Sequence, residues 1–331
     1  MFDHIIVGGG TAACVLANRL TANGRLRVLL LEAGGKPRNP WIRIPAGFTK
    51  LLVNPTYNWR FETKPEENVL GRSIAIPRGR GLGGSSLING MIYVQGQRED
   101  YDQWSALGAT GWYAETLLPY FKQLETYAFA QGMRGTDGPM HIDQVRERYP
   151  IAGAMIEAAN EAGFPYNPDY NGTEQDGFGY YQVTQKEGQR WSTYDGYLKP
   201  ALARPNLEVT TGAMVVKLVF EGKRCVGVTY LRDGHLTTVS AAQSVILAAG
   251  AVQSPQLLEA SGVGDPLRLK ELGIDVVHAN SQVGENYTDH FATRMNWRVR
   301  GASTLNETTR GWQLVRSVIQ YALTRRGALR L

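Results

Sequence analysis

The residues best suited to chemistry are three consecutive glycines and one carboxylate near the N-terminus. Gly8, Gly9 and Gly10 follow the apolar run at residues 5–7, and Glu32 comes after them at close to the ~20-residue spacing typical of dinucleotide sites. Gly8 permits a sharp turn, and Gly10 permits close backbone approach to a pyrophosphate. A glycine-rich turn in an ordinary α/β fold is the alternative. The predicted site for an ADP moiety comprises Gly8, Gly10, Thr11, Ala12, Glu32 and Ala33.

The elements that position these residues are predicted to be a strand, a helix and a second strand. Ala13, Leu16, Ala17 and Leu20 recur at the i, i+3, i+4 and i+7 positions of a helix, and residues 26–31 form a buried strand. This order places the glycines at a strand-to-helix turn, where the helix N-terminus favours an anion. Ala13 stands where the fingerprint has its third glycine, a replacement that it tolerates.

A second glycine-rich stretch covers residues 77–104. Four glycines fall between Gly79 and Gly84, and Ser85 and Ser86 follow them. Such a loop exposes N–H groups and can form a concave nest for an anion. A flexible loop is the alternative, but glycine loses the most conformational entropy on folding, which favours close approach to a ligand.

Residues 79–102 resemble the first signature of the glucose–methanol–choline (GMC) oxidoreductases, which are FAD-dependent alcohol oxidases and dehydrogenases. The resemblance rests on Gly79, Arg80, Leu82, Gly83, Gly84, Ser85, Ser86, Ile88, Asn89, Tyr93, Gly96 and Asp102. It implies that the dinucleotide is FAD and that this stretch lies along the flavin and its diphosphate. The residues implied in that contact are Gly79, Gly83, Gly84, Ser85, Asn89, Gly90, Met91 and Ile92. No histidine, cysteine or tyrosine occurs in residues 83–91, so we expect a flavin held without a covalent bond.

Residues 250–264 resemble the second GMC signature. The matching residues are Gly250, Ala251, Ser254, Pro255, Leu257, Leu258, Ser261, Gly262, Val263 and Gly264. Ser254 is predicted to cap a helix that has Pro255 in its first turn and Gly262 just past its end.

A β region precedes this second signature. The predicted strands are residues 215–220, 226–230, 236–240 and 245–247, with the turn pair Asp233-Gly234 among them. By analogy with FAD proteins of this build, Val215 would lie near the adenine, and Ala249 and Gly250 near the diphosphate.

The predicted fold is α/β. It has a Rossmann-like FAD-binding domain, with a parallel sheet and a β-meander, and an incomplete antiparallel-sheet substrate domain. By the resemblance, the FAD-binding domain comprises residues 1–143 and 189–290, and the substrate domain comprises an excursion at 144–188 and a start at 291–331.

Three local expectations concern helices and one aromatic ring. Helices are predicted at residues 112–124, where Pro119 marks a kink or a break, and at residues 151–162. Trp59 can face a bound ring, but a structural core tryptophan is the favoured interpretation.

The general base that alcohol oxidation needs is not evident among the histidines. His290 adjoins Asp289, but a histidine tied to neighbouring polar groups is favoured over a catalytic role. GMC enzymes carry their catalytic pair, His with His or Asn, in a later segment. The resemblance therefore implies that the base lies beyond residue 331 and that this chain alone does not turn over alcohols at an enzyme-like rate. The histidines present are His4, His141, His235, His278 and His290.

Composition excludes several classes of protein. The net charge of +5 comes from scattered basic residues, which argues against nucleic-acid binding. Cys14 and Cys225 lack metal-site spacing and indicate buried thiols in a reducing compartment. No apolar window reaches the ~18 residues of a membrane span. We expect a cytoplasmic protein, with membrane association through a basic amphipathic helix at residues 314–330 as an alternative.

Three functions are weighed. The first is an FAD-dependent oxidoreductase that acts on a small-molecule alcohol and passes electrons to oxygen or a quinone-like acceptor. The second is a lyase that cleaves cyanohydrins and retains FAD without redox turnover, as a few GMC relatives do. The third is a redox-silent FAD-binding fragment. An NAD dehydrogenase is disfavoured, because it leaves the loop at residues 79–89 unexplained.

Overall fold

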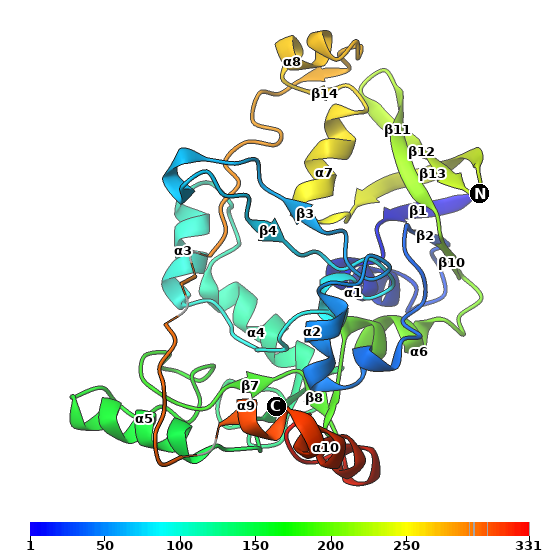
Figure 1. Ribbon diagram of the computed structural model, residues 1–331. Coiled ribbons are helices and arrows are strands. Elements are labelled where there is room, and N and C mark those ends of the chain that lie inside the picture. Colours follow the sequence, from blue (N-terminus) through cyan, green and yellow to red (C-terminus); the bar gives the residue numbers. More distant parts are fainter. Residues whose placement is uncertain (291, 294, 303, 331) are drawn as a thin grey trace. The chain divides into compact units, whose positions relative to one another are not determined.

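A six-stranded sheet carries the N-terminal glycines in the computed structural model, which describes residues 1–290, 292–293, 295–302 and 304–330 (Figure 1). The four strands β10, β2, β1 and β13 pair in parallel, and β13, β12 and β11 form an antiparallel meander. The predicted parallel sheet and β-meander are thus confirmed, joined in one sheet. In spatial order the strands are β10 (Leu207–Thr211), β2 (Val28–Glu32), β1 (Phe2–Val7), β13 (His235–Leu247), β12 (Arg224–Arg232) and β11 (Met214–Glu221).

The register of the sheet brings three strand ends to one edge. Val7 at the end of β1 lies opposite Leu31 of β2 and Leu247 of β13. The segments that follow these residues begin with Gly8, Glu32 and Ala248. In open α/β sheets, ligands bind at the carboxyl ends of parallel strands, so this edge is where the site is expected.

Strand β13 corrects one prediction. Residues 236–240 and 245–247 were expected to form separate strands, but they belong to one strand of 13 residues. Its first half pairs with β12 and its second half pairs with β1, from Ala241 onward. The polar residues between the two apolar runs continue the strand, because pairing with β1 satisfies their backbone groups.

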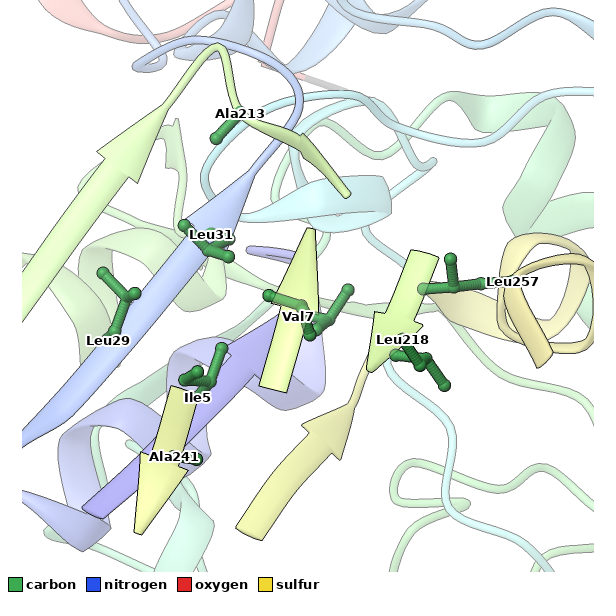
Figure 2. Close-up of a cluster of buried hydrophobic side chains, with 9 residues drawn as sticks. Ile5, Val7, Leu29, Leu31, Ala213, Leu218, Ala241 and Leu257 are labelled. Carbon is green, nitrogen blue, oxygen red and sulfur yellow. The ribbon is translucent and has the colours of Figure 1, made fainter. Parts of the chain in front are cut away.

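Alternating apolar residues build the core on one face of this sheet (Figure 2). Side chains two residues apart point to the same face of a strand. Ile5 and Val7 therefore join Leu29 and Leu31, all at most 3% exposed. Further buried members of the cluster are Ala213, Leu218, Val228, Ala241 and Leu257.

Helix α1 (Thr11–Leu20) buries a narrow stripe of small residues, which includes Ala13, Cys14 and Ala17. Its Asn18 Nδ2 donates to the Tyr197 carbonyl at 2.7 Å. Tyr197 lies in a π-helical turn (Tyr194–Leu198) that leads into α6 (Lys199–Ala201). The small side chains allow α1 to approach its neighbours closely.

Helix α7 (Gly250–Glu259) begins four residues before the predicted cap. Ser254 and Pro255 therefore lie inside the helix, and the sequence prediction of its start was wrong. A serine–proline pair resembles a helix start, whereas α7 begins as soon as β13 ends. Gly262 does lie just past the helix, with φ +87°. Asp265 then caps α8 (Pro266–Glu271), accepting from the backbone N–H groups of Leu267 and Arg268 at 3.0 Å each.

Residues 58–79 form a hairpin, called here the 58–79 hairpin. Strands β3 (Phe61–Glu62) and β4 (Ala75–Ile76) pair in it, and Asn58 bridges to Gly79. Short helical turns occur at Glu67–Val69 within it and at Gly84–Leu87 after it. Strands β14 (Val263–Gly264) and β15 (His278–Ala279) pair separately.

The chain divides into two compact units. Unit 1 comprises Met1–Arg38, Leu51–Ile88 and Thr193–Met295, and contains all the elements described so far. The short helix α2 (Phe48–Leu51) is divided between the units, with only Leu51 in unit 1. Unit 2 comprises Asn39–Lys50, Asn89–Ser192 and Asn296–Leu331. The predicted domain ranges remain a prediction, and their boundary at residue 291 lies outside the described residues.

Unit 2 contains a small mixed sheet in the order β5 (Glu125–Tyr127), β6 (Met140–Gln144) and β7 (Gln182–Val183). Strands β5 and β6 run parallel, and β6 and β7 run antiparallel. A hairpin joins β8 (Gln185–Lys186) to β9 (Gln189–Arg190). The helices of unit 2 are α3 (Arg98–Ala106), α4 (Ala114–Leu124), α5 (Pro150–Glu161), α9 (Leu305–Thr308) and α10 (Gly311–Thr324). Unit 2 also has 3-10 turns at Pro40–Ile42 and Pro45–Gly47.

Two helices of unit 2 bear on the predictions. Helix α4 continues through Pro119 without a break, and the kink that was the other expectation there stays a prediction. Helix α10 leaves its apolar stripe largely exposed, with Val318 at 43% and Ile319 at 52%. No helix in the described parts of the chain has the length and apolar character needed to cross a bilayer.

Candidate functional site

A cavity of about 810 Å³ lies at the carboxyl edge of β1, β2 and β13, within unit 1. Its walls are the ends of these strands, the starts of α1 and α7, the first residues of β11, and the 58–79 hairpin. The predicted site residues on its walls are Gly8, Gly10, Thr11, Ala12, Glu32, Ala33, Gly79, Gly84, Ser85, Val215, Ala249 and Gly250.

Two helix N-termini contribute to the cavity wall. Thr11 and Ala12 line it from the start of α1, and residues 250–253 line it from the start of α7. Neither N-cap residue, Gly10 or Ala249, forms a side-chain hydrogen bond to its helix. The first N–H groups of a helix have no intrahelical acceptor, and the helix dipole favours negative charge there. The cavity is therefore suited to an anion such as a diphosphate.

The glycines of the first motif serve two different purposes. Gly8 has φ +94°, and a Cβ atom there would lie 2.7 Å from the Ala248 carbonyl oxygen, so the turn requires glycine. Gly10 has an ordinary φ of −74°, and a Cβ atom would meet nothing nearer than 3.9 Å. A Cβ on Gly10 would instead occupy cavity space. This open cradle fits a ligand that approaches the backbone closely.

Glu32 holds the surrounding loops together as well as lining the cavity. Its Oε2 accepts from Gly9 N at 2.6 Å, and its Oε1 accepts from Gly34 N at 2.7 Å and Gly81 N at 2.9 Å. This structural role was missed in the sequence, because it depends on loops far apart in the chain. A carboxylate offers about four lone-pair sites, so one remains for a ribose hydroxyl.

The second glycine-rich loop packs directly on the first. Gly84 has φ +53°, and a Cβ atom there would lie 2.7 Å from the Gly10 Cα. Gly83 N donates to the Gly9 carbonyl at 2.8 Å, which places Gly83 beside the cavity rather than on its wall. Ser85 Oγ accepts from Gly79 N at 3.0 Å and closes the loop on itself.

The 58–79 hairpin supplies three large side chains that the predicted site lacked, from Trp59, Phe61 and Arg78. Trp59 and Phe61 stack with ring centroids 5.9 Å apart and planes within 6°. Trp59 is half-buried on the cavity wall, so its favoured interpretation as a core residue was wrong. Arg78 is the positively charged residue of the wall. Its signal in the sequence was only its position next to Gly79.

Asn89, Gly90, Met91 and Ile92 belong to unit 2, where the structure shows their local geometry. Arg190 Nη1 donates to Asn89 Oδ1 at 2.6 Å, and its Nη2 donates to the Asn89 carbonyl at 2.7 Å. Met91 is buried and has φ +64°. These contacts hold the backbone at residues 89–91 in place. A role for the four residues in binding the flavin remains a prediction.

The structure offers His290 no catalytic dyad. Asp289 Oδ1 accepts from the His290 backbone N–H at 2.8 Å, and its Oδ2 accepts from Tyr287 and Arg78, so these groups, rather than the imidazole, occupy the carboxylate. His290 is exposed and is not on the cavity wall. Throughout the described residues, no three His, Cys, Asp or Glu side chains are grouped so as to hold a metal ion.

The sheet, the glycine turn and the paired helix starts define a Rossmann-type dinucleotide-binding protein. The chain belongs more narrowly to the GMC oxidoreductases, whose family model matches residues 2–292. The resemblance seen in the two signatures is thereby confirmed.

The chain is similar to curated choline dehydrogenases. It is 45% identical to the oxygen-dependent choline dehydrogenase of Brucella anthropi over 290 residues, which are 87% of this chain and 53% of that protein. It is 42% identical to the mitochondrial choline dehydrogenase of Mus musculus over 298 residues, 88% of this chain and 50% of that protein. The chain thus spans about half the length of these relatives.

The chain is also similar to solved structures of oxidases. Pyridoxine 4-oxidase from Mesorbium loti is 33% identical with a TM-score of 0.81, and the match covers 84% of this chain and 55% of that one. A formate oxidase from Aspergillus oryzae is 28% identical with a TM-score of 0.89, and the match covers 99% of this chain and 59% of that one.

Proposed function

We propose that unit 1 binds FAD and that the protein oxidises the CH–OH group of a small alcohol. The observation that carries the cofactor assignment is the cavity at which two uncapped helix starts meet beside the open cradle at Gly10. A dinucleotide diphosphate carries the negative charge that a helix start favours.

The residues of the wall divide between the two halves of FAD. Thr11 and Ala12 are proposed to donate backbone N–H groups to the diphosphate, and Glu32 to accept from a ribose hydroxyl. Val215 is proposed beside the adenine. The flavin side is proposed to involve the loop at residues 79–85 together with residues 89–92.

The chemistry belongs to the cofactor, and the chain positions it. Bound flavin accepts a hydride from a carbon that carries a hydroxyl group. The stacked rings of Trp59 and Phe61 form an apolar part of the cavity wall. Arg78 supplies positive charge to an anionic ligand. No histidine among the described residues lies on this wall, so a general base from the cavity itself is not proposed.

Choline is the first substrate to test and oxygen the first acceptor, because the relatives are choline dehydrogenases and several are named oxygen-dependent. A quinone-like acceptor is the alternative. Since the chain spans half the length of those relatives, the activity is proposed for the whole protein. A cytoplasmic location is proposed from the two free cysteines, Cys14 and Cys225.

The experiment is anaerobic reduction of the flavin in the purified whole protein. Choline, benzyl alcohol or pyridoxine is mixed with the oxidised protein under nitrogen, and the yellow absorbance is followed. At least one alcohol is expected to bleach the flavin, and oxygen is expected to restore it. A bound flavin that no alcohol bleaches, in a protein that cleaves a cyanohydrin, would contradict the oxidoreductase proposal and support the lyase.

A further inference from the structure

The 58–79 hairpin forms one wall of the cavity, and Arg78 is built firmly into that wall. The Arg78 carbonyl accepts from Trp59 N at 2.9 Å, and its own N–H donates to Asn58 Oδ1 at 3.0 Å. Movement of Arg78 therefore moves the strand of the hairpin that carries Trp59. Among the residues that line the cavity in the described chain, Arg78 is the one with a positive charge.

The Arg78 side chain is tied to a distant segment of unit 1. Its Nη2 donates to Tyr287 Oη at 2.9 Å and to Asp289 Oδ2 at 3.2 Å. Tyr287 Oη also donates to Asp289 Oδ2 at 3.1 Å, and Arg78 Nη1 donates to the Pro77 carbonyl at 2.9 Å. The three side chains thus form a closed triangle in which each contacts the other two.

The segment that carries Tyr287 and Asp289 begins close to α7. A Cβ atom on Gly284 would lie 3.8 Å from Glu259 Oε1 and 3.9 Å from Pro255 Cβ. The neighbouring α7 residues Ser254 and Gln256 line the cavity. Residues 284–289 therefore run from near α7 to the Arg78 side chain of the hairpin.

We propose that the triangle of Arg78, Tyr287 and Asp289 is a latch that holds the 58–79 hairpin closed and slows the release of the bound dinucleotide. The inference rests on the proposed function, since it takes FAD as the ligand. The latch acts by position, because Tyr287 and Asp289 hold Arg78, and Arg78 holds the hairpin. Charge attraction from Arg78 to the diphosphate is a separate effect. For one variant it predicts the opposite change in the rate of FAD release.

The two explanations predict opposite changes in the rate of FAD release for Asp289→Asn. This change removes a negative charge next to Arg78, so attraction of Arg78 to an anionic ligand would grow and release would slow. A latch predicts the reverse, because the hairpin loses an anchor. Each of Asp289→Asn, Tyr287→Phe and Arg78→Lys is expected to release FAD about two- to fivefold faster, the effect of losing ~0.5–1 kcal/mol from a partly exposed ion pair.

The experiment measures release directly. Whole protein loaded with FAD is diluted, and the fluorescence of freed FAD is followed with time. Glu285→Gln is the matched control, because it removes a carboxylate from the same segment and no contact of its side chain with Arg78 is seen. The control is expected to release FAD at the wild-type rate. Release by Asp289→Asn at or below the wild-type rate would overturn the latch.

A second measurement separates the latch from the cofactor. The hairpin carries two exposed trypsin sites, Arg60 and Arg72, whose backbone must leave the hairpin to enter the protease. Cleavage within residues 60–72 is expected to be faster in Asp289→Asn than in wild type and Glu285→Gln. A wild-type protein that binds no FAD would contradict the proposed function. FAD-loaded variants with unchanged release and cleavage would contradict the latch alone.

Discussion

Gly8 and Gly10 stand two residues apart in one motif, yet the structure requires them for opposite reasons. At Gly8, protein atoms leave no room for a side chain. At Gly10, protein atoms leave the space empty, and this space opens into the cavity, where a ligand can occupy it. Substitution at the two positions should therefore fail in different ways.

Gly10→Ala is predicted to keep the fold and lose the cofactor. Its backbone φ of −74° suits alanine, so stability should change by less than ~1 kcal/mol. The added methyl group occupies the cradle, and FAD affinity should fall at least ~10-fold, or ~1.4 kcal/mol. Urea unfolding and a fluorescence titration with FAD measure the two effects. Gly8→Ala is the contrasting variant and should unfold the protein. Normal FAD affinity in Gly10→Ala would show that the cradle does not hold the dinucleotide.

Cys14 lies under the same turn, and burial is the main cause that raises the pKa of its thiol to about 12. Below about pH 7.5 the thiol is neutral in both the folded and the unfolded chain, so it adds almost no pH dependence there. Above pH 9 the unfolded chain loses the proton first, so stability falls as the pH rises towards 12. Between pH 8 and ~10.5, wild type should lose ~1–2 kcal/mol more than Cys14→Ala. Equal losses in urea unfolding would argue that this thiol ionises normally.

At the scale of elements, the sequence predicted what local patterns determine. The strand–helix–strand order at residues 1–32 was correct, because its apolar spacing and its glycines lie within one short segment. The start of α7 was wrong because Ser254 and Pro255 imitate a helix start. The single strand β13 and the parallel pairing of β5 with β6 depend on partners distant in the chain, which local patterns do not specify.

The site residues also divide into those that local sequence patterns predict and those that depend on distant parts of the chain. The glycines were predicted, since backbone geometry constrains them directly. The bonds of Glu32 to three loop amides, the position of Trp59 on the wall and the bonds of Arg78 all arise from contacts between remote segments. Those contacts become visible only when the sheet edge and the 58–79 hairpin are assembled.

Helix α4 tolerates a proline that local rules disfavour, and this makes a test at the element scale. Pro119 is exposed inside the helix, where it cannot donate to the Glu115 carbonyl. Pro119→Ala should stabilise the protein by ~1–2 kcal/mol, since the gain in helix propensity exceeds the loss of chain stiffness. Pro150→Ala is the control, because Pro150 is the first residue of α5 and suits that position. A lower melting temperature for Pro119→Ala would indicate that the proline is needed for packing.

At the scale of the whole molecule, unit 1 contains a nearly complete set of the features that a dinucleotide needs. The sheet edge, both helix starts and the two glycine-rich loops converge on one cavity within it. The substrate and the catalytic base concern the whole protein. The central claim is therefore about the cofactor: this cavity holds FAD, without a covalent bond.

The most direct measurement is the identity and amount of cofactor that the purified protein releases. The protein is precipitated with acid, and the supernatant is examined by absorbance and chromatography against FAD and NAD standards. The account predicts yellow supernatant that contains about one FAD per chain for wild type and little for Gly10→Ala. Nicotinamide without flavin, or colour retained in the pellet, would contradict it.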